Sequence, residues 1–383
     1  MSKLVIIGTG LAGYTLAREF RRRDEQTELL LITRDDGSSY SKPMLSNALS
    51  KGKQVGELIM ASAEKMAGNL NAEIMTHTLV SEINLSDKFL QTDRGVVHYN
   101  RLILANGARA IRPQIGGDAC DQVLSVNDLT DYRDFRSRIH NGSHVVIVGA
   151  GMIGCEFAND LSNMDVTTHV IDLAPQVLGR ILPEQIASVL QDKLTQLGVN
   201  WYLKNSVNSV EHQGAKLLVT LMDGTTISAD VVLSAIGLRP DIEIAKIAGL
   251  DTDRGIKVNR NLQTSDESVY ALGDCAQVED LTLPFVMPLM TSARALAATL
   301  SGDETAVKYP AMPVTLKTPC YPTVVCPPPR DYNGEWDVEI TAQGIRAWNK
   351  DGSGNPLGFV LTDELIAEKS SLSKQLADWL VTQ

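Results

Sequence analysis

The 383-residue sequence lacks a long apolar run, an excess of positive charge and any close pair of cysteines. No apolar stretch approaches the roughly 18 residues that a membrane-spanning helix needs. The formal net charge of −11 disfavours nucleic acid as a partner, because no net counterion release would drive the contact. With 44% hydrophobic and 21% charged residues, the composition is that of a globular protein with two or three domains. We expect a cytoplasmic protein that is not inserted in a membrane.

The cysteines are few and widely spaced. They are Cys120, Cys155, Cys275, Cys320 and Cys326, an odd number with no two closer than six positions. This spacing fits neither a disulfide framework nor a C-x-x-C redox or zinc pair. Prolines surround Cys320 and Cys326, and no histidine lies near them in sequence, so we expect no metal site.

The sequence LVIIGTGLAGY, residues 4–14, contains a glycine fingerprint for dinucleotide binding. An apolar strand over 4–7 leads into a turn over 8–13, helical spacing over 14–23 and a second strand over 27–33. Glycines at the first, third and sixth positions of such a turn let the backbone approach a pyrophosphate, and the N–H groups at the helix start attract the anion. The second strand ends on Thr33 and Arg34, so we expect a hydroxyl or backbone group, rather than a carboxylate, at the ribose.

A second fingerprint follows in VVIVGAGMIGCEFAND, residues 145–160. A strand over 145–148 is followed by a turn over 149–154, a helix from Cys155 and a strand over 166–171 that ends on Asp172. A carboxylate at this position binds a ribose 2′-hydroxyl and repels the 2′-phosphate of NADP. The second unit therefore predicts an NADH site.

Three later strands mark where the chain crosses between domains: LILANGA (102–108), VVLSAIGLRPD (231–241) and VYALGDCA (269–276). The last delivers Asp274 beside Gly273, where the carboxylate serves either as a helix cap or as a ligand-binding group. From residue 310 onward, β-rich runs, a DGSG turn and a final amphipathic helix from Asp363 predict a small module of sheet and helix.

In this order, the motifs GxGxxG, A-x-G, GxGxxGxE, A-I-G-x-R-P and A-L-G-D resemble those of the two-dinucleotide flavoprotein reductases, over essentially the whole chain. Within that group, YSKPMLS (40–46), GAGMIGCEFANDLS (149–162), LGDCA (272–276), VMPLM (286–290) and MPVTLKTP (312–319) are most similar to the NADH-dependent rubredoxin reductases. One departure is Ala105-Asn106-Gly107 in place of A-T-G. Asn keeps a side-chain hydrogen-bonding group there, so we still expect flavin binding.

The resemblance implies an α/β fold with two Rossmann-like dinucleotide-binding domains, for FAD and NADH, and a small C-terminal α+β domain. The implied division is 1–110 and 237–309 for the two parts of the FAD-binding domain, 111–236 for the NADH-binding domain and 310–383 for the C-terminal domain.

The resemblance also implies the cofactor contacts. For FAD these are Gly8, Thr9, Gly10, Leu11 and Ala12 at the pyrophosphate, Thr33 and Arg34 at the adenosine ribose, Val80 at adenine, Asp274 at the ribityl chain, Val286 at the pyrimidine edge of the flavin and Lys317 over the ring. For NADH they are Gly149, Gly151, Met152, Ile153 and Gly154 at the pyrophosphate, Asp172 at the ribose and Gly237 near the nicotinamide.

Two charged residues and one cysteine have implied roles beside the flavin. Lys42 and Glu156 are expected to meet at its redox edge, where the cation would stabilise the reduced ring. The alternative is a buried structural ion pair, or two unrelated surface charges. Cys155 lies on the first turn of a helix, which can lower a thiol pKa. Because no second cysteine is near it in sequence, we interpret it as a small packing residue.

The implied activity is hydride transfer from NADH to FAD, followed by single-electron transfer to rubredoxin, which supplies systems such as alkane hydroxylases. Alternatives are an NADH reductase of a flavorubredoxin or ferredoxin, and a slow-turnover FAD/NADH redox sensor. An NADH oxidase or thiol–disulfide reductase is disfavoured, because Lys42 occupies the segment where a reactive cysteine would be wanted. For docking of an acidic carrier we expect a basic patch of Lys42, Lys51 and Lys53, with 21–23 as a weaker choice. The sequence leaves the oligomeric state open, and a monomer is compatible with it.

Overall fold

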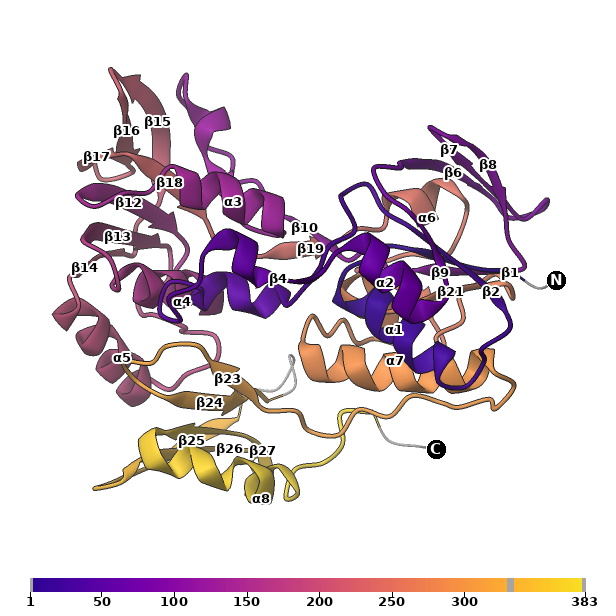
Figure 1. Cartoon of the computed structure of the whole chain (residues 1–383). Helices are drawn as coiled ribbons and strands as arrows, with labels where there is room; N and C mark the ends of the chain where they lie inside the picture. Colours follow the sequence, from indigo (N-terminus) through magenta and orange to yellow (C-terminus); the bar gives the residue numbers. More distant parts are fainter. Residues whose placement is uncertain (1–2, 329–333, 381–383) are drawn as a thin grey trace.

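A computed structural model describes residues 3–328 and 334–380, and Figure 1 labels its main elements. The first part of the chain builds a parallel sheet with the strand order β21-β9-β1-β2-β5. Four of its strands, β1, β2, β9 and β21, are short apolar runs with mostly buried side chains, as in parallel sheets covered on both faces, and the edge strand β5 is partly exposed. Helices α1 and α7 pack against each other beside this sheet. The elements are β1 (Lys3–Ile7), α1 (Leu11–Arg21), β2 (Glu28–Ile32), β5 (Glu73–Met75), β9 (Arg101–Leu104), β21 (Val269–Ala271) and α7 (Val286–Leu300).

Smaller elements complete this part of the molecule. They are β3 (Ser39–Tyr40), η1 (Lys42–Asn47), η2 (Val55–Leu58), β4 (Ile59–Ala61), α2 (Ala63–Leu70), β6 (Val80–Asn84), β7 (Phe89–Thr92), β8 (Gly95–His98), α6 (Glu243–Ile247), β20 (Ile256–Val258), η4 (Gly273–Cys275) and β22 (Ala276–Val278), where η denotes a 3₁₀ helix.

The middle of the chain builds a second parallel sheet with the order β11-β18-β12-β13-β14. Its two faces bury different partners. Three helices share one hydrophobic cluster with one face, and a three-stranded antiparallel meander shares another cluster with the opposite face. The elements are η3 (Cys120–Gln122), β11 (Leu124–Ser125), α3 (Leu129–Ser137), β12 (Ser143–Val148), α4 (Met152–Leu161), β13 (Val166–Asp172), α5 (Glu184–Gln196), β14 (Val199–Leu203), the meander β15 (Val207–Gln213), β16 (Lys216–Leu221) and β17 (Thr226–Ala229), and β18 (Val231–Ser234).

Two antiparallel strands join these two parts. β10 (Ala108–Ala110) pairs with β19 (Leu238–Pro240), so the outgoing and returning chain cross side by side. The salt bridge from Arg109 Nε to Asp241 Oδ2, at 2.8 Å, and the hydrogen bond from Asn106 Nδ2 to Asp241 O, at 2.5 Å, hold this ribbon.

The C-terminal part is an antiparallel sheet with the order β23-β24-β27-β26-β25. Figure 1 shows it beside the second sheet, with α8 on its outer side. The single amphipathic helix expected from Asp363 is wrong, because a 3₁₀ segment leads into a five-residue helix. The elements are β23 (Val314–Leu316), β24 (Thr323–Cys326), β25 (Glu335–Thr341), β26 (Gly344–Lys350), β27 (Pro356–Thr362), η5 (Asp363–Glu368) and α8 (Lys369–Ser373).

The segment between β3 and β4 departs from the expected division. Leu45, Ala48 and Leu58 are buried in the same cluster as the helices of the second sheet, although the sequence assigns them to the first domain. Leu316 and Val325 of the C-terminal sheet belong to this cluster as well. Three parts of the chain therefore share one core around α4.

Both fingerprint helices begin three residues earlier than expected, at Leu11 and Met152 rather than Tyr14 and Cys155. The third glycine of each fingerprint thus lies inside its helix. Within residues 3–328 and 334–380, no helix combines the length and apolar character needed to cross a bilayer.

Candidate functional site

The two glycine turns have nearly identical geometry. Gly8 and Gly149 adopt φ of +111° and +114°, and a Cβ on either would collide with a neighbouring strand end, at Ala105 O or Ala235 O. A Cβ on Gly13 or Gly154 would overlap the carbonyl oxygen of the turn's first glycine. These glycines therefore make the close contact of strand, turn and helix possible.

The middle glycine of each turn has a different environment. A Cβ on Gly10 or Gly151 would meet no atom within 4 Å. Each is the N-cap of its helix, makes no side-chain capping bond among the described residues, and is followed by a first turn without acidic residues. Open space at an uncapped helix N-terminus fits a pyrophosphate. The turns thus fit the FAD and NADH pyrophosphates that the sequence predicts.

A carboxylate lies at the first turn after all. Asp35 Oδ1 accepts hydrogen bonds from Thr33 Oγ1 at 2.7 Å and Gly37 N at 2.9 Å, and lies 3.5 Å from Thr9 Oγ1. Thr33 is buried and Arg34 is exposed. The strand-end pattern predicts Thr33 and Arg34 at the ribose, and Asp35 lies one residue beyond this pattern. Its position 22 residues after Gly13 was the available signal.

The strand that begins at Val80 lies near this end of the first turn. Thr78 N donates to Thr33 O at 2.8 Å, which brings the chain just before Val80 beside the end of β2. Val80 itself is half-buried. This placement suits the adenine contact that the resemblance implies.

Asp172 holds the second turn. Its Oδ2 accepts from Ala150 N at 2.5 Å and its Oδ1 from Ala174 N at 2.7 Å, so the carboxylate lies directly beside the glycine turn. Gly237 lies on the segment that follows β18, and β18 and β13 flank β12 on opposite sides. Gly237 has φ of +117°, and its carbonyl accepts from Ile111 N at 3.0 Å. Met152 is half-buried and Ile153 is exposed on the first turn of α4.

Two more residues expected at FAD, Asp274 and Val286, follow β21 in the chain. A Cβ on Gly273 would lie 2.8 Å from the Cβ of Ala12, so Asp274 in η4 lies beside the start of α1. Val286, which is exposed, opens α7, another helix without a side-chain cap among the described residues. The structure therefore brings Ala12 and Asp274 together and places the first turn of α7 near them.

Lys42 does not pair with Glu156, so this expectation is wrong. Its Nζ donates to Asn127 Oδ1 at 2.7 Å, and Asn127 Nδ2 donates in turn to Ala108 O at 2.8 Å. Burial lowers the pKa of Lys42, while the charge of Asp274 raises it. Burial raises the pKa of Asp274, while Lys42 lowers it. Among the carboxylates that raise the pKa of Lys42, Asp274 has the largest effect, ahead of Asp128 and Asp131.

Glu156 pairs instead with Lys317. The Lys317 ammonium forms an ion pair with Glu156 Oε2, and Lys317 N donates to Oε1 at 3.1 Å. Ser46 Oγ donates to Oε2 at 2.6 Å. The glutamate is completely buried, so its charge depends on these three donors. The donors come from two other parts of the chain, at Ser46 and Lys317, and no sequence pattern indicates which lysine reaches Glu156.

Cys155 is packed rather than poised for reaction. It is completely buried, and its Sγ lies 3.4 Å from Ala150 O. Burial raises the pKa of its thiol and the charges of Asp172 and Glu156 raise it further, so the neutral form is favoured. All five cysteines are free thiols. These observations support its interpretation as a packing residue.

Comparison with known proteins adds to this geometry. Residues 2–297 match the family described as "Pyridine nucleotide-disulphide oxidoreductase", and residues 306–376 match "Rubredoxin binding C-terminal domain". The rubredoxin-NAD(+) reductase of Alcanivorax borkumensis is 45% identical over 98% of this chain and 99% of its own. That of Acinetobacter baylyi is 44% identical over the whole of both chains.

Two further proteins are similar over nearly their full length. The nitric oxide reductase FlRd-NAD(+) reductase of Vibrio vulnificus strain CMCP6 is 35% identical over 98% of each chain. A ferredoxin reductase structure from Rhodopseudomonas palustris superposes with a TM-score of 0.89 at 25% identity, covering 100% of this chain and 96% of that one.

Proposed function

Because this chain belongs to the pyridine nucleotide-disulphide oxidoreductase family, in the group of the rubredoxin-NAD(+) reductases, we propose that it carries electrons from NADH through FAD to rubredoxin. We choose rubredoxin as the electron acceptor because residues 306–376 match a rubredoxin binding domain. Two uncapped glycine turns, one for each nucleotide, support the two-cofactor scheme.

Bound FAD supplies the hydride acceptor and the single-electron donor of this scheme. The chain's own residues bind and orient. Gly8 to Ala12 hold the flavin nucleotide's pyrophosphate, with Thr33, Arg34 and Val80 at its adenosine end. Asp274 accepts from the ribityl chain, and the first N–H groups of α7, at Val286, donate to the pyrimidine edge.

Lys317 and Lys42 supply positive charge from two sides. Glu156 fixes Lys317 through its ion pair and through the backbone N–H of the same residue. Asn127 fixes Lys42. In our proposal these cations favour electron-rich states at the flavin, since a preorganised charge in a dry site acts without reorganisation.

On the other nucleotide, Gly149 to Gly154 bind the pyrophosphate of NADH and Asp172 accepts from its ribose. Gly237, which has no side chain, leaves room for the nicotinamide. We also propose a cytoplasmic location, where NADH is available, and service to an alkane hydroxylase or a similar rubredoxin-dependent system.

NADH-driven reduction of purified carriers tests this function. Bleaching of ferric rubredoxin by the enzyme and NADH should proceed at a turnover on the order of 10 per second, and with a higher kcat/KM than for a ferredoxin or for oxygen. A turnover slower by several orders of magnitude with every carrier would favour the redox-sensing alternative.

A flavorubredoxin is the second candidate partner. The relative at 35% identity is named as an FlRd-NAD(+) reductase, which favours testing this carrier beside rubredoxin. If the rubredoxin domain of a flavorubredoxin is reduced at least as efficiently as free rubredoxin, the carrier assignment changes while the NADH and FAD assignments stand.

Replacement of Asp274 tests the flavin site. Asp274→Ala should weaken FAD retention more than it disturbs folding, because the half-buried carboxylate is proposed to hold the cofactor. The measurement is the ratio of flavin to protein absorbance after dialysis, with the thermal midpoint as a folding control. Full retention in the variant would remove Asp274 from the site.

A further inference from the structure

One face of α4 carries three polar side chains in an otherwise apolar core. Glu156, Asn159 and Asp160 are 0%, 4% and 2% exposed. Residues three and four apart on a helix share a face, so the three form one polar surface beyond the NADH-binding turn. The proposed function uses only Glu156. Asn159 and Asp160 have no role in it so far.

Asp160 binds the main chain of the first domain. Its Oδ1 accepts from Ser50 N at 2.8 Å and its Oδ2 from Leu49 N at 3.1 Å. Burial raises the pKa of this carboxyl, while these two amides lower it. A buried carboxylate is stable as an ion only with such partners, so the contact fixes where the 49–50 backbone lies.

Asn159 binds the main chain of the C-terminal part in the same way. Its Oδ1 accepts from Cys320 N at 3.2 Å. The 318–321 turn is closed by a backbone hydrogen bond, in which Tyr321 N donates to Thr318 O at 2.9 Å. Two segments that are distant in sequence are therefore hydrogen-bonded to adjacent residues of one helix.

Each anchored segment begins at a lysine of the proposed flavin site. Lys42 opens η1, which ends two residues before Leu49, and Leu45 and Ala48 are buried against the α4 core. Lys317 precedes Cys320 by three residues. The segments 42–50 and 317–320 are both short and packed. A shift of the backbone at 49–50 or at 320 therefore also shifts the lysine at the start of the segment.

We propose that Asn159 and Asp160 are positioning residues: through the 49–50 and 320 amides they keep Lys42 and Lys317 in fixed register with the NADH-binding turn at the start of α4. This rests on the proposed function, because the lysines matter only if flavin lies between them. At 1.5 Å per residue, Asp160 is about 12 Å along the helix from Met152, a distance that a rigid helix spans without loss of register.

A local test needs neither cofactor nor carrier. Asp160→Asn replaces one acceptor by an NH₂ group that faces an N–H donor, so the 49–50 segment should open more often. Trypsin cleavage after Lys51, which is exposed, should then accelerate about tenfold, as expected for the loss of a charged hydrogen bond. Asn159→Ala should raise the alkylation rate of Cys320 similarly, in a Cys120→Ser background because Cys120 is exposed.

Asp165→Asn is the matched control. It removes the same charge from an exposed side chain five residues further along, and it should change neither rate. Unchanged cleavage in Asp160→Asn and unchanged alkylation in Asn159→Ala would overturn the proposal at this step.

The second test separates positioning from stability. In single-turnover mixing of NADH with flavin-loaded protein, each variant should lower the rate constant of flavin reduction about tenfold, leave the NADH dissociation constant within about twofold and shift the flavin midpoint potential. If reduction per bound flavin and the potential match wild type while the segments open faster, Asn159 and Asp160 are structural only and the proposal fails. If both tests succeed but wild type reduces no rubredoxin, the carrier assignment fails and the positioning role stands.

Discussion

In the proposed NADH site, Asp172 has one role in the fold and a second, predicted role toward the ligand. Its two oxygens accept from Ala150 N and Ala174 N, so the carboxylate fixes the glycine turn before any coenzyme arrives. A carboxylate accepts about four hydrogen bonds in total, which leaves lone pairs for a ribose. The same negative charge opposes a 2′-phosphate.

Wild-type protein should therefore prefer NADH to NADPH. Loss of ribose hydrogen bonds and added repulsion amount to roughly 2 to 4 kcal/mol, or about 30- to 1000-fold in kcat/KM. Steady-state kinetics with both coenzymes measure this ratio. Equal values would refute the assignment of Asp172.

Burial in the fold keeps the Cys155 thiol in its neutral, unreactive form. Cys155→Ala should leave carrier reduction within about twofold of wild type, because the thiol is completely buried and has a raised pKa. The variant should lose at most about 1 to 2 kcal/mol in the free energy of unfolding. Loss of NADH oxidation by orders of magnitude in a folded variant would bring thiol chemistry back.

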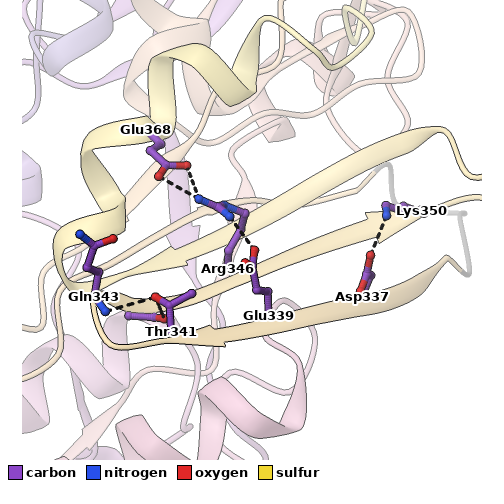
Figure 2. Close-up of polar contacts among 8 residues, drawn as sticks. Asp337, Glu339, Thr341, Gln343, Arg346, Lys350 and Glu368 are labelled. Carbon is purple, nitrogen blue, oxygen red and sulfur yellow. Dashed lines mark hydrogen bonds and ion pairs between the residues drawn. The ribbon is translucent and has the colours of Figure 1, made fainter.

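At the scale of elements, the outer hairpin of the C-terminal sheet carries a row of charges. Figure 2 shows Arg346 of β26 between Glu339 of β25, at 2.6 Å, and Glu368 of η5, at 2.7 Å. Among the residues that the structure describes, Lys350 forms its ion pair with Asp337, at 2.6 Å, in the same hairpin. Arg346 therefore ties the sheet to the helical segment that covers it, and Lys350 does not.

Arg346→Met should accordingly destabilise the protein by about 1 kcal/mol, whereas Lys350→Met should change the free energy of unfolding by less than about 0.5 kcal/mol. Denaturant unfolding of the two variants checks the difference. Added salt should reduce it, since exposed pairs are screened. An equal loss in both variants would show that the contact to η5 contributes nothing.

The elements also show what the sequence can predict. Both glycine fingerprints, their strands and the α/β class are confirmed, because turn chemistry and apolar runs are local properties. The pairing of Glu156 was mispredicted, because Lys42 and Lys317 are both remote from it in sequence and only the packed structure selects Lys317. The polar spacing of Glu156, Asn159 and Asp160 on an apolar helix was visible, but its partners were not.

For the molecule as a whole, the net charge of −11 matters most at long range. An acidic carrier must approach against it, so docking needs a local basic or apolar surface. Lys51 is exposed and Lys53 half-buried in the turn after η1, whereas Lys42 is bound to Asn127. The alternative at 21–23 is weaker still, since all three donor nitrogens of Arg21 bind backbone carbonyls.

Rubredoxin reduction at low carrier concentration should therefore slow as salt rises from about 0.01 to 0.3 M, because screening shortens the Debye length to about 10 Å at 0.1 M. NADH reduction of the flavin should change little. Reversing Lys51 and Lys53 to Glu should lower the carrier rate at low salt and flatten its salt dependence. A rate indifferent to salt would place docking elsewhere.

The β10–β19 ribbon makes the middle of the chain an insertion with adjoining ends. Neighbouring antiparallel strands lie about 4.8 Å apart, so residues 111–237 leave and rejoin the first sheet almost at one point. We expect that such a unit can be exchanged between homologues as a cassette, and that the proposed NADH site moves with it. The graft must also bring the 45–58 segment, or Leu45, Ala48 and Leu58 would meet a foreign core. Recombination in this family should accordingly have two linked breakpoint pairs instead of one.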